Sequence, residues 1–255
     1  MLKVEDLYFS YGGNRPVLRG ASLELEQGQV GILLGKNGSG KTTLFKNILG
    51  IEKPKKGSIS FEGENLLKMS GRERARRIAY VPQHIHFGDM TVFDSVLMGR
   101  VSYFGMKAGR EDYETVERIL KDMGLLEFAD RSAEALSGGE KQKIAIARAM
   151  AQEPKLMVFD EPTGNLDMAN EQLIIQEAKK LARQKNISIL SSLHDLNQAL
   201  YFGDKFFFLK DGIVKYAGGK EVFTQEIIRD IFDIDAQIVE INNQKVILGG
   251  YYHEA

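Results

Sequence analysis

One short segment has residue types and spacing suited to binding phosphate. Residues 35–42, GKNGSGKT, match G-x-x-x-x-G-K-[ST] and lie between an apolar run at 29–34 and a stretch at 41–49 predicted to be helical. Glycines let the backbone turn so that N–H groups face phosphate oxygens, and the following helix adds its positive dipole. Lys41 would neutralise the β- and γ-phosphates, and the Thr42 hydroxyl would ligate Mg²⁺. The motif predicts a site for Mg-ATP, with a plain glycine-rich loop as the alternative. The residues expected at the phosphates are Gly35, Asn37, Gly38, Ser39, Gly40, Lys41, Thr42 and Thr43.

A phosphate loop also needs an acid near the metal and a group that activates water. Asp160 and Glu161 directly follow the apolar run 156–159, so we expect Asp160 in the Mg²⁺ shell and Glu161 as the general base. The alternative is a pair of loop acids that cap the next helix. His194 follows a predicted strand at 187–193 and would reach the edge of the sheet where ligands of open α/β sheets bind. Taken alone, His194 is better explained as an ordinary partly buried histidine, and Gln83 as a polar loop residue.

The elements that must position these groups alternate between strand and helix. The pattern predicts strands at 3–9, 18–26, 29–34, 58–62, 78–82, 156–159, 187–193 and 206–209, and helices at 41–49, 141–152, 168–184 and 195–202. From 94 to about 123 the pattern is also helical, because Tyr113, Val116, Leu120 and Met123 recur at spacings of three and four. Asp211-Gly212 predicts a hairpin turn, and the last thirty or so residues predict one short helix and a small hairpin around Asn242-Asn243. This alternation predicts an α/β fold with a parallel sheet covered on both faces.

Composition bounds the possible functions. The 255 residues suit one large α/β domain, or one core with a smaller inserted subdomain. Lysine and arginine total 34 against 35 acids, so the net charge of −1 gives no support for nucleic acid as main partner. The basic run RERARR at 72–77 is better explained by a solvated helix face than by a binding patch. The absence of cysteine excludes disulfides and thiolate chemistry. The acidic N-terminus does not resemble a signal peptide, and no apolar window is long enough to span a bilayer, so any work at a membrane requires another polypeptide.

One further segment carries a family resemblance. Residues 136–140, LSGGE, precede the predicted helix 141–152 and the Asp160-Glu161 strand, and this order resembles the ABC-type ATPases, whose signature is usually LSGGQ. Glu140 departs from that form, but the Ser-Gly-Gly core is intact. Ser137, Gly138 and Gly139 would offer a hydroxyl and N–H groups to an anion at a helix start. The resemblance implies that this signature closes over the γ-phosphate held by a second copy, in a head-to-tail dimer with two-fold symmetry.

The resemblance covers nearly the whole chain, with six motifs in the expected order. It implies that Tyr11 stacks on adenine, that Gln83 is the Q-loop glutamine, and that His194 contacts the γ-phosphate. It also implies that Asn165-Leu166-Asp167 is the D-loop at the dimer interface. The implied Mg²⁺ ligands are Thr42, Gln83 and Asp160, and the implied catalytic residues are Glu161, His194, Gln83 and Lys41.

The family fold implied is a P-loop NTPase core with a mainly parallel sheet, an N-terminal antiparallel β subdomain and an inserted α-helical subdomain. We expect one ABC ATPase domain over 1–255. Its core would comprise 1–84 and 154–215, its helical subdomain 85–153, and a short αβ tail 216–255.

Residues 83–137 form the insertion through which this family contacts its transmembrane partner. The stretch 90–100, MTVFDSVLMGR, resembles the importer ATPases for iron-siderophores, haem and cobalamin, and EKQK at 140–143 and HDLN at 194–197 favour the same group. Zinc, manganese and molybdate importers have comparable segments. The resemblance implies as partners a second copy of the chain, permease subunits and, indirectly, a substrate-binding protein, with no nucleic acid. The chain would lie peripherally at the cytoplasmic face of the membrane.

Two rival classes remain. One is the soluble ABC ATPase that helps assemble iron–sulfur clusters, which Pro162-Thr163 and the permease-like stretch 90–100 disfavour. The other comprises ABC-type ATPases of translation and DNA repair, which usually carry a tandem ATPase domain or a long coiled-coil insertion. Cargo cannot be read from this chain, because in an importer the permease and a binding protein recognise it.

Overall fold

The computed structural model describes residues 1–12, 15–163, 167–242 and 244–249. The chain forms two compact units, the first from residues 1–67 and 190–255 and the second from 68–189. The second unit contains the stretch expected as the helical subdomain, but the expected boundaries at 84, 153 and 215 stay predictions. The α/β class and the antiparallel N-terminal sheet are confirmed.

The N-terminal sheet of the first unit has the strand order β2-β1-β4-β5. Its strands are β1 (Leu2–Phe9), β2 (Leu18–Leu25), β4 (Lys56–Phe61) and β5 (Glu64–Asn65). Both β2 and β4 pair antiparallel with β1. Apolar side chains alternate along these strands and are buried on one face, with Leu2, Val4 and Leu7 at or below 1% exposure. This half-buried pattern is the one expected of an antiparallel sheet.

A second set of strands in the first unit carries the phosphate loop. β3 (Val30–Leu34), buried at all five positions, pairs parallel with β9 (Lys205–Lys210), and β10 (Ile213–Gly218) pairs antiparallel with β9. β8 (Ser188–Ser192) lies beside β3. The helix α1 (Lys41–Ile48) follows the loop, and α7 (Leu196–Phe202) packs on β3. A continuously apolar strand followed by a helix is typical of parallel sheets.

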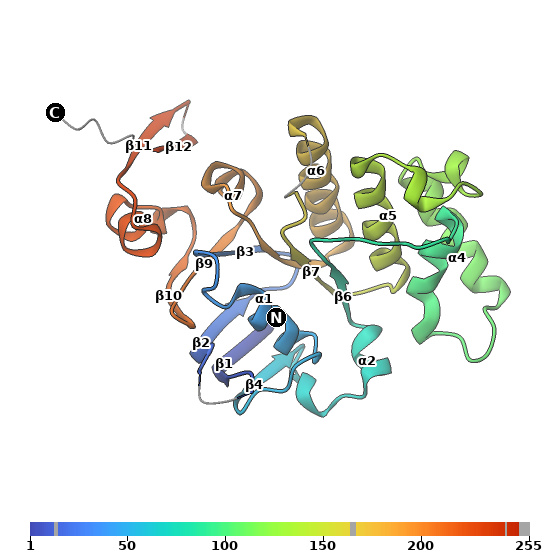
Figure 1. Cartoon of the computed structure of the whole chain (residues 1–255), viewed down its shortest axis with the longest axis horizontal. Coiled ribbons are helices and arrows are strands. Elements are labelled where there is room, and N and C mark those ends of the chain that lie inside the picture. The colour runs from blue at the N-terminus through green and yellow to red at the C-terminus, as the bar shows by residue number, and fades with distance from the viewer. Residues whose placement is uncertain (13–14, 164–166, 243, 250–255) are drawn as a thin grey trace. The chain divides into compact units, whose positions relative to one another are not determined.

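The C-terminal part of the first unit is built on phenylalanines. Phe223 packs edge-on against Phe206 and Phe208, with ring centroids 4.7 and 5.3 Å apart. These contacts hold the start of α8 (Gln225–Phe232), which is followed by the antiparallel hairpin β11 (Ala236–Ile241) and β12 (Gln244–Gly249). Figure 1 shows this hairpin at the red end of the chain. The expected helix and hairpin are confirmed, although Asn243 lies outside the described residues.

In the second unit, β6 (Ile78–Val81) pairs parallel with β7 (Leu156–Asp160). The helix α5 (Gly138–Ala151) contacts α3 (Val92–Leu97), α4 (Arg110–Asp122) and α6 (Met168–Lys185). Figure 1 shows α6 and α4 on either side of α5. Nine of its fourteen residues are buried, as a central helix requires. In the part of the chain that the structure describes, no helix is both long and apolar enough to cross a membrane.

The expected helical stretch from 94 to 123 is wrong as one helix. α3 ends at Leu97, a 3₁₀ segment η2 (Met98–Ser102) follows, and α4 begins only at Arg110. Gly105 and Gly109 lie in the interval, and the Asp112 carboxylate accepts a hydrogen bond from the Gly109 N–H at 2.8 Å. The break follows because glycine disfavours helix interiors and this side chain caps a new helix start.

The arginine run at 72–77 forms the expected helix, α2 (Gly71–Ala75), but the expected solvated face is only partly right. The Nε atoms of Arg72 and Arg76 donate to the Ser102 carbonyl at 2.7 and 2.9 Å. The carbonyls at the end of a 3₁₀ segment lack partners of their own, so guanidinium groups supply the donors.

Candidate nucleotide site

The phosphate loop joins β3 to α1 through a tight backbone. A Cβ at position 35 would lie 2.3 Å from the Leu209 carbonyl oxygen, so glycine is required where the loop passes β9. Gly40 has φ 111° and precedes the first residue of α1. Because Gly40 has no side chain, it cannot cap the N–H groups at the start of α1, and uncapped N–H groups at a helix start are a typical anion site.

Lys41 is held inside this loop. Its side chain is buried, and Nζ donates to the carbonyls of Gly35 at 2.8 Å and Lys36 at 3.4 Å. Among the described residues, Ser39 Oγ is one of few buried side-chain atoms with no hydrogen-bond partner. A buried cation, an unpaired hydroxyl and a glycine backbone together match the chemistry of a nucleotide's phosphates. The loop therefore fits the expected ligand.

Two other expected residues of the first unit lie beside these elements. Tyr11, a residue that is 43% exposed, has its hydroxyl 3.4 Å from Thr43 Oγ1 on α1. Its ring also packs edge-on against Phe9, with centroids 4.9 Å apart. His194 follows β8 and is exposed, so it is not the partly buried histidine of the alternative interpretation. Their roles toward adenine and the γ-phosphate stay predictions.

In the second unit, the expected acids stand at the end of β7. Asp160 is 4% exposed, and Glu161 has a left-handed backbone with φ 51°. A non-glycine residue with positive φ is uncommon and clusters at functional sites. The next helix, α6, has Asp167 as its N-cap, with Oδ1 accepting from the Asn170 N–H at 2.9 Å. The capping alternative for Asp160 and Glu161 is therefore wrong.

Neighbouring side chains orient both acids. The Gln83 side-chain amide donates to Glu161 Oε2 at 2.5 Å, so the Q-loop residue and the expected base are brought together. The Tyr80 hydroxyl donates to Asp160 Oδ2 at 3.4 Å. Burial, with the Asp160 charge beside it, raises the pKa of Tyr80 to about 12. Tyr80 was missed from the sequence, where a tyrosine in a strand gives no signal of this contact.

The signature segment starts α5 with a capping box. Ser137 is the N-cap, the Ser137 N–H donates to Glu140 Oε2 at 2.8 Å, and the Glu140 N–H donates to Ser137 Oγ at 3.4 Å. Hydrogen bonds from the Ser137 hydroxyl and N–H lower the pKa of Glu140. Glutamate and glutamine both serve at this position of a capping box, which explains how Glu140 replaces the usual glutamine.

The signature also lies close to Asn170, in the first turn of α6 and three positions after Asp167 of the expected D-loop. A Cβ at Gly139 would lie 2.3 Å from Asn170 Oδ1, and the Asn170 amide donates to Asp167 Oδ2 at 2.9 Å. Asn170 thus connects the signature to Asp167 within one unit. Asn165 and Leu166 lie outside the described residues. The sequence pattern did not single out Asn170, because it lies on a predicted helix outside every motif.

The comparison with protein families decides the class. The ABC transporter family model matches residues 18–164. The chain belongs to the ABC transporter family. An uncharacterized ABC transporter ATP-binding protein of Methanocaldococcus jannaschii is 38% identical over 97% of this chain and 97% of its own length. The iron(3+)-hydroxamate import ATP-binding protein of Bacillus subtilis is 35% identical, over 93% and 90%. The phosphonates import ATP-binding protein of a Synechococcus strain is 32% identical, over 91% and 90%.

Solved structures of ABC ATPases agree. A metal-chelate type ABC transporter in an inward-facing conformation has 30% identity and a TM-score of 0.85, over 98% of this chain and 97% of that chain. A dimeric ATP-binding cassette in a post-hydrolysis state with ADP and Pi has 29% identity and a TM-score of 0.75, over 86% and 98%. The expected recognition, fold and enzyme class are confirmed: this ABC protein binds ATP and is an ATPase.

Proposed function

We propose that this ABC ATPase powers an importer through a separate permease, at whose cytoplasmic face it lies. The observation that carries the proposal is a cavity of about 530 Å³ in the second unit. Part of its lining, Met98 and Gly99, belongs to the stretch 90–100 that resembles importer ATPases, and the rest comes from α2, from 101–105 and from Gln152. Its lining residues are Gly71, Arg72, Ala75, Met98, Gly99, Val101, Ser102, Phe104, Gly105 and Gln152.

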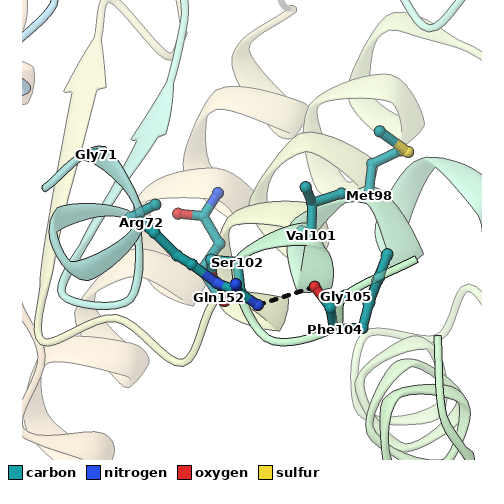
Figure 2. A pocket seen from close by; sticks show the side chains of 10 residues that line it. Gly71, Arg72, Met98, Val101, Ser102, Phe104, Gly105 and Gln152 are labelled. Carbon is teal, nitrogen blue, oxygen red and sulfur yellow. Dashed lines mark hydrogen bonds between the residues drawn. The ribbon is translucent and has the colours of Figure 1, made fainter. Parts of the chain in front are cut away.

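The cavity suits an apolar partner segment. Figure 2 shows Met98, Val101 and Phe104 around it, and the first two are 51% and 48% exposed. Exposed apolar side chains gathered at a concave surface favour protein docking, and a groove of this kind accepts a helix. Arg72, which also lines the cavity, donates to the carbonyls of Ser102 and Phe104, at 2.7 and 2.9 Å, and fixes the wall they form.

The buried side chain of Arg100 stabilises the same wall of the cavity. The Arg100 side chain is 3% exposed and donates to Asp112 Oδ1 at 3.0 Å, to the Ala151 carbonyl at 3.1 Å and to Glu153 Oε2 at 2.7 Å. Its guanidinium lies 3.8 Å from the centroid of the Tyr103 ring. Breaking a buried charged network of this kind is strongly destabilising, so the wall is rigid before any partner binds. Preformed surfaces bind with less loss of entropy.

For the chemistry, we assign one Mg-ATP to the phosphate loop. The loop and Lys41 bind the phosphates, and Tyr11 contacts the adenine. Thr42, Gln83 and Asp160 supply the oxygen ligands that Mg²⁺ prefers. Glu161 acts as general base for the attacking water, and His194 contacts the γ-phosphate. Bound Mg²⁺ neutralises the charge that develops on the phosphates. In the part of the chain that the structure describes, no cluster of three or more acidic or histidine side chains could hold a metal by itself, which fits an ion brought by the nucleotide.

We also propose that two copies bury two nucleotides head to tail. Ser137 is the N-cap of a fourteen-residue helix that begins at Gly138, and both residues are exposed while Gly139 is buried. A helix start of this kind offers N–H groups to an anion. The phosphate loop already serves as the primary phosphate site, so the signature would act on the nucleotide of a second copy. ATP would favour the closed dimer because it contacts both copies, and hydrolysis would release it.

For cargo, we propose a metal-related compound such as an iron-siderophore, haem or cobalamin complex. The iron(3+)-hydroxamate relative and the metal-chelate structure support this group, while the phosphonates relative keeps an anionic cargo as the competing candidate. A substrate-binding protein would complete the system. Compared with a soluble cluster-assembly ATPase, an importer subunit better explains an exposed apolar cavity with a rigid wall.

Size-exclusion chromatography of Glu161→Gln tests the nucleotide-driven dimer. We expect ATP with Mg²⁺ to convert monomer to dimer and ADP to leave it monomeric. Protein that stays monomeric at saturating ATP would refute a nucleotide-driven dimer of the isolated subunits.

Co-purification tests the importer. Val101→Glu should lose the permease while keeping ATP binding, and Leu126→Glu, at another exposed apolar position of the same unit, should keep both. Equal permease recovery with Val101→Glu would overturn the docking assignment. Identification of the ligand on the co-purified binding protein would decide the cargo.

A further inference from the structure

The side chain of Asn197 fastens α7 to the C-terminal hairpin. Its Nδ2 donates to the Ile247 carbonyl at 2.9 Å, and its Oδ1 accepts from the Ile247 N–H at 2.8 Å. A carboxamide carries one donor side and one acceptor side, as a peptide group does. Asn197 therefore pairs with the free edge of β12 as a neighbouring strand would.

The hairpin is itself well anchored, so it can serve as a fixed point. Ile247 is 6% exposed and stands opposite Ile238 in the β11–β12 register. Lys245 Nζ donates to the carbonyls of Lys220 and Phe223, at 3.1 and 3.3 Å. Phe223 in turn packs against β9 through Phe206 and Phe208. Through the hairpin and Phe223, Asn197 is thus connected to the buried core of its unit.

Asn197 lies in the first turn of α7, which burial of side chains alone does little to stabilise. The buried residues of α7 are Ala199, Leu200 and Phe202, all of which follow Asn197 in the helix. Asp195 caps the helix, accepting from the Gln198 N–H at 2.7 Å, and His194 directly precedes this cap. Asp195 and Asn197 belong to one capped turn, and His194 is joined directly to Asp195, so a displacement of this turn at Asn197 moves the point at which His194 is attached.

We propose that Asn197 is a positioning residue for His194. Asn197 holds the first turn of α7 against the hairpin β11–β12. The proposal rests on the assignment of His194 to the γ-phosphate. Asn197 touches no reacting group; it sets where the imidazole stands when ATP is hydrolysed. The strands β11 and β12 therefore belong to the catalytic support, although they lie beyond the 18–164 match to the family model.

The test uses the full-length chain with two substitutions and a control. Asn197→Ala removes both hydrogen bonds, whereas Asn197→Asp keeps the acceptor toward the Ile247 N–H but cannot donate to its carbonyl when ionised. We expect turnover to fall roughly three- to tenfold in Asn197→Ala, and less in Asn197→Asp, as two lost hydrogen bonds permit. The Kd for ATP should stay within about twofold, because no phosphate contact is lost. Gln244→Ala, at an exposed position in the same hairpin, should match wild type.

Two readouts separate positioning from general destabilisation. Hydrogen exchange of the nucleotide-free protein should quicken in peptides covering both 193–202 and 236–249 of Asn197→Ala. Faster exchange confined to 236–249, or unchanged turnover in a folded variant, overturns the proposal. In a double-mutant cycle, Asn197→Ala should add little to the residual turnover of His194→Ala, because the residue it positions is gone. If the losses of turnover in the two single variants multiply in the double variant, the positioning role is also overturned.

The cycle also distinguishes this proposal from the assignment on which it rests. Wild-type turnover in His194→Ala would remove the catalytic role of His194, and with it the positioning role. Inactive His194→Ala with fully active Asn197→Ala would refute only the role of Asn197. Thermal unfolding of each variant identifies any that fails to fold, in which case Asn197→Asp carries the same comparison.

Discussion

The side-chain amide of Gln83 donates a hydrogen bond to Glu161 Oε2 at 2.5 Å. A neutral amide that donates to a carboxylate restricts the rotamer of the acid without adding a charge beside it. Glu161 also has a left-handed backbone, which directs its side chain away from the path of an extended strand. The proposed base is therefore oriented before any nucleotide binds. This bond uses the amide nitrogen of Gln83, whereas its amide oxygen is the atom that would bind Mg²⁺.

Substitution of Glu161 by glutamine is the direct test of this base. We expect Glu161→Gln to bind ATP as wild type does and to hydrolyse it about 10² to 10⁴ times more slowly, the usual contribution of a general base. The amide keeps the size of the side chain and can still accept from Gln83, so folding should be unchanged. Phosphate release and binding of a fluorescent ATP analogue measure the two effects. Wild-type turnover would contradict the assignment.

The sequence predicted the local parts of this site and missed most of the connections between them. The phosphate loop, the acid pair and the signature each lie within one short segment, so residue type and spacing reveal them. Gln83 and Glu161 are 78 positions apart, and no local pattern predicts their hydrogen bond. Asn170 can lie against the signature only because Gly139 has no side chain, and this contact depends on the packing of α5 against α6.

The broken helix between 94 and 123 shows the same limit. The spacing of three and four fits α4. Around η2, by contrast, Arg72 and Arg76 donate to the Ser102 carbonyl, and Arg100 donates to the Asp112 carboxylate. The glycines and the Asp112 cap that favour the break lie within the window, but the hydrogen bonds from Arg72 and Arg76 come from outside it, so local spacing does not reveal them.

The capping box at the signature predicts a pH-dependent stability. The pKa of Glu140 is lowered from its ordinary value of 4.5, chiefly by the Ser137 hydroxyl. A carboxyl whose folded pKa is depressed stabilises the protein above its unfolded pKa, and the effect disappears as pH falls through the folded value. Glu140→Gln should keep the cap but lose the charge near the positive end of α5, a loss of at most about 1 kcal/mol before solvent screening.

Urea unfolding of wild type and Glu140→Gln between pH 7 and pH 3 measures this difference. Wild type should be the more stable protein near neutrality, and the two curves should converge below about pH 4.5. A difference that is independent of pH would show that the carboxylate charge contributes nothing to the cap.

Close approach of η2 to α5 predicts a severe effect of one methyl group. A Cβ at Gly99 would lie 2.1 Å from the Arg148 carbonyl oxygen, whereas a Cβ at Gly105 would meet nothing within 4 Å. Gly99→Ala should therefore lower the free energy of unfolding by about 1–3 kcal/mol, as overpacking does, or displace the cavity wall. Gly105→Ala is the matched control in the same loop and should be near neutral. Equal unfolding midpoints for the two variants would show that η2 can shift to accommodate the added methyl group without strain.

The ion pair between Lys36 and Asp233 predicts a salt-dependent effect on nucleotide affinity. Lys36 lies in the phosphate loop, and Asp233 follows α8 with a left-handed backbone that asparagine also tolerates. Asp233→Asn removes a negative charge beside the loop and frees the Lys36 ammonium. We expect ATP to bind roughly two- to fivefold more tightly at low ionic strength, which is the range of an exposed pair.

Isothermal titration at about 0.02 and 0.5 M salt measures this effect, which screening should largely abolish at the higher value. Asp235→Asn is the control, because Asp235 pairs with Arg229 at 3.2 Å and not with the loop. The same gain in both variants would reveal a general charge effect. Weaker ATP binding in Asp233→Asn would show instead that the pair holds Lys36 in its binding position.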